Sequence, residues 1–261
     1  MKNKQANVIP EDYIEFLHWL KEKTEASWRE KAKEGEEPHW TQDAKWIGMT
    51  DDEIDHVEKK YAIRFVPEHR QFLNILHTID RKEKIKYTES FDEGADVKTE
   101  YRPFYYNWLS DDEDIKRMLN WSYREILRDV LKPDGMWLAS WGEKVASEEE
   151  KTAIFAEWFR KTPVLLPLTS HRFLVSDETL VDRPVLSVWG SDTIVYAWSL
   201  KHFLLNEFSG ALGLMNYLYD NEGNLRDMEY GDELGELNEE EYELSKSKEI
   251  PFFNEMILYW S

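Results

Sequence analysis

The sequence predicts an α+β fold, a single domain in which a twisted, mainly antiparallel sheet is flanked by helices. Short runs of β-branched and aromatic residues follow one another between residues 164 and 198, with patterns of helical period before and after them. Strands grouped in this way are typical of antiparallel sheets rather than of alternating βαβ units. The chain has 261 residues, of which 14% are aromatic, enough for a large core although 33% are charged.

The N-terminal part is expected to be a helical extension, residues 1–46, packed on a core domain of residues 47–261. Within the extension, apolar side chains recur at helical spacing from residue 11 to residue 34, and Gly35 and Pro38 follow. Glycine and proline both disfavour a helix interior, so the helix is expected to end there. No Pro-, Gly- or Ser-rich linker divides the rest of the chain, which favours one domain.

Capping patterns mark the starts of the next helices. Thr50 and Glu53 have the capping-box spacing, in which each side chain satisfies a free backbone amide of the first turn. Pro67 suits the first position of a further helix, because its fixed φ and missing N–H are tolerated there. Ser110 and Glu113 repeat the capping-box spacing and predict a helix that continues to about residue 131. Two aromatic-rich stretches are expected to form strands: 84–91 and 101–109.

The central sheet follows a helix that begins at a third capping box, formed by Ser147 and Glu150. Short connections between the next strands predict an antiparallel meander, with its tightest turn at Ser191-Asp192. Ser199 is expected to cap the next helix, which continues through residue 208. The strands of the meander are predicted at 164–168, 173–175, 185–189 and 194–198.

The chain is strongly acidic, with 53 Asp and Glu against 33 Lys and Arg and a net charge of −20. This sign of charge repels phosphate, so no binding to nucleic acid or to an anionic membrane is expected, whereas a basic protein would be attracted. Half of the excess lies between residues 220 and 255, in a predicted acidic insertion at about 220–249. The insertion is either a solvated loop or a docking surface for a basic partner. The acidic residues expected to contact that partner are Asp232, Glu233, Glu236, Glu239 and Glu240.

Composition and motifs exclude several chemistries. The chain has no cysteine, which removes disulfides, thiol nucleophiles and cysteine-held metals. The sequence has no phosphate-binding glycine loop, nucleophile elbow or His-Glu-x-x-His motif, so we assign no cofactor, metal or catalytic residue. Its longest stretch without Asp, Glu, Lys or Arg, 208–219, is far shorter than the roughly 20 residues of a membrane span. The region after Met1 lacks the apolar run of a secretory signal, so a cytoplasmic protein is expected.

One polar pair interrupts the predicted meander. His171 and Arg172 lie between two apolar strands, where a sheet would half-bury both side chains. One interpretation makes Arg172 a carboxylate clamp and His171 an acid–base or recognition group. The other, which we favour, is structural: both side chains bond to acids or carbonyls, for instance Asp192 or Asp182, because buried charges are seldom unpaired.

Tryptophan is abundant, with 12 copies in the chain. Exposed tryptophans could form platforms for carbohydrate, but Trp158, Trp189 and Trp198 lie at the spacing of core residues. Packing in the core is therefore the expected role.

Several of these segments together resemble the SUKH superfamily, which includes bacterial relatives of a yeast cell-wall assembly regulator. The opening signature of that family is a helix, a loop ending in Leu-Pro and a helix with a Phe-Leu pair. Here Glu58, Pro67 and the pair at 72–73 match it, whereas Val66 replaces the usual Leu; near the C-terminus, Phe253 occupies a position where Trp is common. The segments similar to a bacterial subgroup are, in order, Leu166-Pro167-Leu168, His171-Arg172-Phe173-Leu174, Pro184–Val188, Asp192–Tyr196 and Ile250-Pro251-Phe252-Phe253.

The resemblance implies an α+β core and, for bacterial members, an immunity protein that binds and neutralises a toxin domain, often a nuclease. It implies no established catalytic site. An acidic protein is suited to this role, since an acidic surface can cover a basic nuclease site. The motif residues to which the resemblance gives a structural or binding role are Glu58, Pro67, His171, Arg172, Asp192 and Pro251.

Two other functions are also compatible with the sequence. The first is an intracellular regulatory or scaffold protein that binds a cellular peptide or protein, with an aromatic sheet as its binding surface. The second is a hydrolase whose site includes His171 and Arg172. Our leading hypothesis is a non-catalytic binding protein for a basic, nuclease-type toxin.

Overall fold

The computed structural model describes residues 8–30, 39–88, 96–181 and 183–259. It confirms the predicted α+β class with antiparallel sheets. Contacts between Cα atoms divide the chain into two compact units. The boundary expected at residue 46 lies inside unit 1 rather than between the units. Unit 1 consists of 1–63, 67–109 and 205–235, and unit 2 of 64–66, 110–204 and 236–261.

Unit 1 begins with three helices. The first ends at Trp28, earlier than predicted, and the last residues of the predicted helix lie outside the described part. The capping box at Thr50 and Glu53 is present as predicted, with both reciprocal hydrogen bonds. Pro67 is the first residue of its helix, also as predicted. The helices are α1 (Tyr13–Trp28), α2 (Asp51–Tyr61) and α3 (Pro67–Ile75).

Aromatic side chains make up much of the core of unit 1. The rings of Trp46 and Phe208 lie 5.4 Å apart, and those of Phe72 and Tyr105 5.5 Å apart. Edge-to-face and tilted contacts of this kind stabilise a core beyond the area they bury. The segment after residue 103 therefore packs inward as irregular chain and does not continue as the strand predicted at 101–109.

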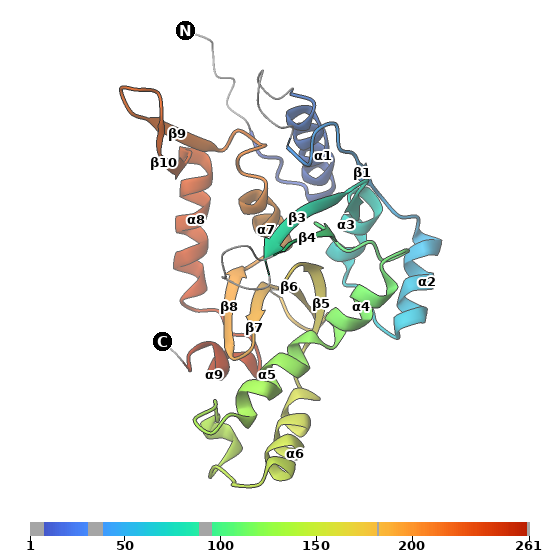
Figure 1. Cartoon of the computed structure of the whole chain (residues 1–261), viewed down its shortest axis with the longest axis vertical. Coiled ribbons are helices and arrows are strands. Elements are labelled where there is room, and N and C mark those ends of the chain that lie inside the picture. The colour runs from blue at the N-terminus through green and yellow to red at the C-terminus, as the bar shows by residue number, and fades with distance from the viewer. Residues whose placement is uncertain (1–7, 31–38, 89–95, 182, 260–261) are drawn as a thin grey trace. The chain divides into compact units, whose positions relative to one another are not determined.

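The sheets of unit 1 are two-stranded and antiparallel. The strand predicted at 84–91 starts earlier, and its last residues lie outside the described part. The hairpin of β9 and β10 was not predicted and continues into α8 (Figure 1). The strands are β1 (Trp46–Ile47), β2 (Thr78–Ile79), β3 (Lys82–Thr88), β4 (Val97–Pro103), β9 (Met215–Tyr219) and β10 (Leu225–Tyr230).

Unit 2 contains the predicted meander, a four-stranded antiparallel sheet in the order β5-β6-β7-β8 (Figure 1). The tight turn is Gly190-Ser191, one residue earlier than predicted, and Asp192 begins β8. Gly190 has a positive φ of 63°, and a Cβ there would lie 2.1 Å from the Asp129 carboxylate, so only glycine fits. The strands are β5 (Val164–Thr169), β6 (Arg172–Ser176), β7 (Val185–Trp189) and β8 (Asp192–Ala197).

One predicted cap in unit 2 is wrong. Asp111 rather than Ser110 is the N-cap of α4, and the Ser110 hydroxyl contacts the Asp111 carboxylate. The helix also stops at Asn120, whose side chain donates to the Lys116 carbonyl and competes with the helical bonding. Helices α4 (Asp112–Leu119) and α5 (Trp121–Leu131) replace the one predicted helix.

The remaining caps of unit 2 agree with the sequence patterns. Ser147 accepts a hydrogen bond from the Glu150 amide, and the Ser199 hydroxyl accepts one from the His202 amide.

None of the helices in the described ranges combines the length and apolar character needed to cross a membrane. The further helices are η1 (Ala139–Trp141), α6 (Glu148–Phe159), α7 (Leu200–Glu207), α8 (Asp232–Ser245) and α9 (Phe253–Ile257); α7 and α8 each continue from one unit into the other.

Candidate partner-binding surfaces

The five acidic residues predicted to bind a partner all lie on one helix, α8. The helix carries seven acidic residues and no basic one. Six of these side chains are exposed, whereas Glu241 is partly buried. The exposed acids are Asp232, Glu233, Glu236, Glu239, Glu240 and Glu243.

The acidic stretch is not a loop, which was one of the two interpretations of its sequence. Most of it forms β10 and α8. In unit 2, Glu241 accepts hydrogen bonds from His202 Nδ1 at 2.9 Å and from the Trp198 amide at 3.2 Å. Burial by itself would lower the pKa of His202, but the hydrogen bond and charge of Glu241, together with Asn238, raise it. These contacts hold the helix in place while its other carboxylates face solvent.

The β9–β10 hairpin of unit 1 is amphipathic. Residues paired across two strands point to the same face of the sheet. The register pairs Met215 with Tyr230, Tyr217 with Met228 and Tyr219 with Leu225, so one face is wholly apolar. The opposite face pairs Asn216 with Glu229 and Leu218 with Asp227.

The apolar face of the hairpin is exposed. Five of its six side chains are between 44% and 62% accessible. Contiguous exposed apolar side chains rimmed by polar groups mark interaction sites in many proteins. The hairpin and the residues directly after it are acidic, with Arg226 as the one basic residue from 215 to 233. The acids of this segment are Asp220, Glu222, Asp227, Glu229, Asp232 and Glu233, of which Asp227 and Glu229 lie on the face opposite the apolar one.

The hairpin could have been found in the sequence. Apolar residues alternate from Met215 to Tyr219 and again from Met228 to Tyr230, and a turn containing Gly223 joins the two runs. Gly223 has a positive φ of 84°, and Asp220 accepts bonds from two amides of the turn. The density of acidic residues from 220 onwards obscures this alternation, so the sequence predicts an acidic insertion there rather than a strand.

His171 and Arg172 take part in packing contacts. The guanidinium of Arg172 lies 4.1 Å from the centroid of the Tyr196 ring, and its Nη1 donates to the Ser187 hydroxyl at 3.0 Å. His171 Nδ1 lies 3.0 Å from the Ser170 hydroxyl. Burial and the charge of Arg172 lower the pKa of His171. The suggested pairing with Asp192 is wrong, because a cation–π contact takes its place; Asp182 lies outside the described residues.

Of the three tryptophans predicted at core spacing, Trp158 is buried as expected, whereas Trp198 is half-buried. Trp189, at the end of β7, is 57% exposed. The Trp189 ring contacts Trp121 at 5.8 Å and His171 at 5.6 Å. Trp189 is the last residue of β7, and the four residues before it in the strand are buried.

Glu58 and Pro67, the first pair of motif residues, have local structural roles in unit 1. Glu58 Oε2 forms an ion pair with Arg70 Nη1 at 3.0 Å and so joins α2 to α3. Pro67 starts α3. These contacts account for both residues without a ligand.

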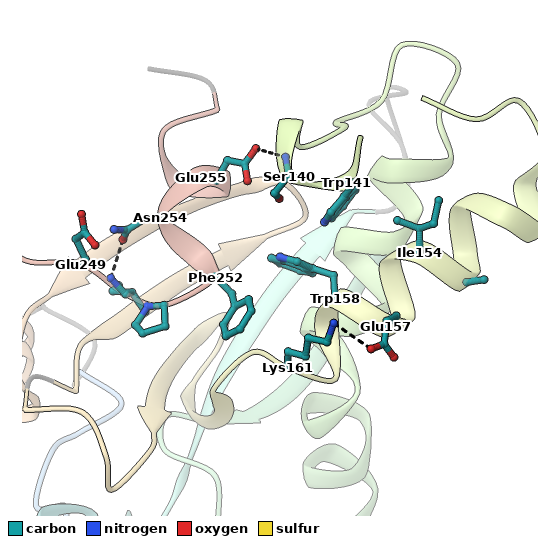
Figure 2. Close-up of a pocket in the computed structure, with 13 residues that line it drawn as sticks. Ser140, Trp141, Ile154, Glu157, Trp158, Lys161, Glu249, Phe252, Asn254 and Glu255 are labelled. Atoms are coloured by element: carbon teal, nitrogen blue, oxygen red, sulfur yellow. Dashed lines mark hydrogen bonds and ion pairs between the residues drawn. The ribbon is translucent and has the colours of Figure 1, made fainter. Parts of the chain in front are cut away.

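The C-terminal segment with Pro251 lines an open pocket of about 760 Å³ in unit 2 (Figure 2). Its aromatic walls come from Trp141 of η1, Trp158 of α6 and Phe252. Trp141 and Trp158 contact each other edge to face, with ring centroids 5.5 Å apart. Phe252 has a positive φ of 67° and is 46% exposed, so its ring stands at the mouth of the pocket on a strained backbone.

Charged groups surround this pocket on several sides. Hydrogen bonds from Arg160 and Lys161 lower the pKa of Glu157 to about 2. Glu255 accepts a hydrogen bond from the Ser140 amide at 3.1 Å. Glu249 is exposed on the opposite wall from α6, as Figure 2 shows. The lining therefore carries three carboxylates and one lysine.

The geometry assigns no catalytic or metal centre. Over the described parts of the chain, no group of three or more His, Asp and Glu side chains is arranged to hold a metal ion. The fold forms three features typical of binding surfaces: the exposed acids of α8, the apolar face of the hairpin in unit 1 and the aromatic pocket in unit 2.

No family model matches the chain, and neither the curated proteins nor the solved structures compared with it include a match.

Proposed function

We propose that this chain is a non-catalytic protein that binds a basic protein partner. The observation that carries the proposal is the β9–β10 hairpin, whose one face presents six apolar side chains in a strongly acidic surrounding. An apolar centre with a polar rim is the usual composition of a protein interface. The many acidic residues of this segment favour a partner of opposite charge, and the exposed acids of α8 would speed its approach.

The class of partner follows from the chemistry of the surface. Phosphate-rich partners are disfavoured, because the chain has a net charge of −20. A basic nuclease-type toxin has the required charge, and the resemblance to the SUKH superfamily leads to the same class. The protein would then act as an immunity protein in the cytoplasm of the cell that makes it.

The test is direct binding to the purified product of the adjacent open reading frame, measured by surface plasmon resonance at several salt concentrations. We expect a complex whose association rate falls steeply with salt, since steered association depends on screened charges. Tyr219→Ser with Met228→Ser removes two side chains from the apolar face and should mainly raise the dissociation rate.

A matched pair of charge variants locates the steering. The first neutralises Asp232, Glu233, Glu236, Glu239 and Glu240 to their amides, and we expect an association rate about tenfold lower at low salt. The second removes the same number of charges elsewhere and should leave most of that rate. Its substitutions are Glu22→Gln, Asp52→Asn, Glu143→Gln, Glu148→Gln and Glu150→Gln. Equal losses in the two variants would disprove a role for α8, and no complex at all would remove the proposed function.

A further inference from the structure

We propose that the aromatic pocket of unit 2 binds the guanidinium group of an arginine side chain on the basic partner. That the arginine belongs to a basic partner rests on the proposed function, whereas the preference for a guanidinium rests on the pocket residues alone. The pocket is defined by Trp141, Trp158, Phe252, Glu249 and Glu255 (Figure 2). It lies wholly within unit 2.

Trp141, which is half-buried, and Phe252, which is exposed, provide faces for a flat cation, whereas the buried Trp158 forms the inner wall of the pocket. Trp158 is held by Trp141 at 5.5 Å and by Phe253 at 5.9 Å, both in edge-to-face contact. Rings held in this way keep their orientation, which lowers the entropy lost on binding. Cations within about 6 Å of a tryptophan or phenylalanine face are attracted to it, and arginine is found there more often than lysine.

The backbone at Phe252 suggests that its ring has a role outside the core. A bulky residue with positive φ is strained, and strain of this kind persists where the surroundings hold it. The hydrogen bond from the Ile250 amide to the Asn254 side chain, at 2.7 Å, closes the turn in which Phe252 lies. Because the ring is 46% exposed, core packing does not account for its position.

The charges leave two carboxylates to pair with a cation. Glu157 already lies 3.0 Å from both Arg160 and Lys161, so the one lysine of the lining is matched within the protein. Glu249 and Glu255 bring further negative charge to the opposite wall, and Glu255 uses one oxygen for the Ser140 amide. An apolar aromatic pocket with surplus carboxylates favours a cation with an apolar stem over an anion or a sugar.

A guanidinium fits these groups better than an ammonium. It is planar, stacks on aromatic faces and pairs with a carboxylate through two parallel hydrogen bonds. An ammonium is more strongly hydrated and loses more on entering an apolar pocket. The pocket should therefore prefer arginine to lysine at equal charge.

The experiment uses the full chain labelled with nitrogen-15 and follows the indole signals of Trp141 and Trp158 by NMR, assigned through Trp→Phe variants. The probes are Nα-acetyl-arginine methylamide, the lysine equivalent and the neutral citrulline equivalent. We expect saturable shifts with the arginine probe, weaker ones with lysine and none with citrulline. Glu249→Gln with Glu255→Gln should weaken arginine binding at least about threefold, and Phe252→Leu by a similar factor. Glu143→Gln, an exposed acid outside the pocket, should leave it unchanged.

Equal shifts with citrulline, or no loss in the double glutamine variant, would overturn the guanidinium assignment. A lysine probe that binds more tightly than arginine would do the same. These measurements use no partner protein, so their failure leaves the test of the proposed function intact. Conversely, a pocket that takes arginine while the adjacent gene product does not bind would separate the two proposals.

Discussion

Glu241 and His202 join helices α8 and α7 within unit 2. The Glu241 carboxylate lies 2.9 Å from His202 Nδ1, and both side chains are largely buried. Asn238, one turn before Glu241, contacts the other ring nitrogen. A buried imidazole bonded to a carboxylate on one side and an amide on the other is the anchor of an otherwise solvent-facing acidic helix.

This pair gives a pH dependence with a defined sign. Burial opposes the charged imidazole, but Glu241 and Asn238 raise the pKa of His202 overall. The folded state then binds its proton more tightly, so this stabilisation is complete below the unfolded pKa of about 6.5 and is lost as the pH rises through the folded value. In urea titrations, Glu241→Gln should lower the free energy of unfolding by about 1–3 kcal/mol at pH 6. Glu240→Gln is the control, and an equal loss there would contradict the anchor.

His69, in unit 1, gives the opposite dependence. Burial, with a smaller effect of His77, lowers the pKa of His69 to about 3. The unfolded chain takes up this proton at a higher pH, so stability is complete above about 6.5 and falls as the pH drops towards the folded value. His69→Leu should flatten the decline of the thermal midpoint between pH 6.5 and 4. The exposed His18→Leu should leave that slope as in the wild type, and a similar flattening in both variants would refute the assignment.

The contact between Arg172 and Tyr196 is expected to stabilise the meander. Because Arg172 is paired with a ring and a hydroxyl rather than with an acid, its removal strands no buried carboxylate. We expect Arg172→Ala to cost about 1–2 kcal/mol, below the cost of breaking a buried ion pair. Tyr196→Leu should lose the part due to the ring, while Tyr196→Phe should keep it. A double-mutant cycle measures the coupling, and a coupling near zero would show that the contact is incidental.

Phe252 allows backbone strain to be measured apart from its ring. Phe252→Ala and Phe252→Gly both remove the ring, but only glycine adopts a positive φ without strain. The glycine variant should therefore be more stable than the alanine variant by about 1 kcal/mol. At Glu22, exposed in the middle of α1, the same pair should show the reverse order, because glycine weakens a helix interior. Alanine more stable than glycine at both positions would mean that residue 252 is not strained.

Local patterns in the sequence predicted much of the fold. Thr50, Pro67 and Ser199 begin helices as expected, because a cap depends on the few residues around it. The four strands of the meander were predicted from alternation and short turns for the same reason. The predictions failed where a neighbour competed locally, as at Asn120, or where dense charge obscured an alternating pattern, as in β10.

Some features of the candidate surfaces could be predicted from the sequence, whereas others depend on how the chain folds. The charge of residues 232–240 and the location of a polar pair at His171 and Arg172 follow from the order of residues alone. That Tyr217 and Met228 share a face follows from the folded hairpin, because a face depends on strand register. The tertiary structure also brings Trp141 and Trp158 together with Phe252, about 100 residues further along the chain. Contacts between distant segments are set by how whole elements pack, and no local pattern records them.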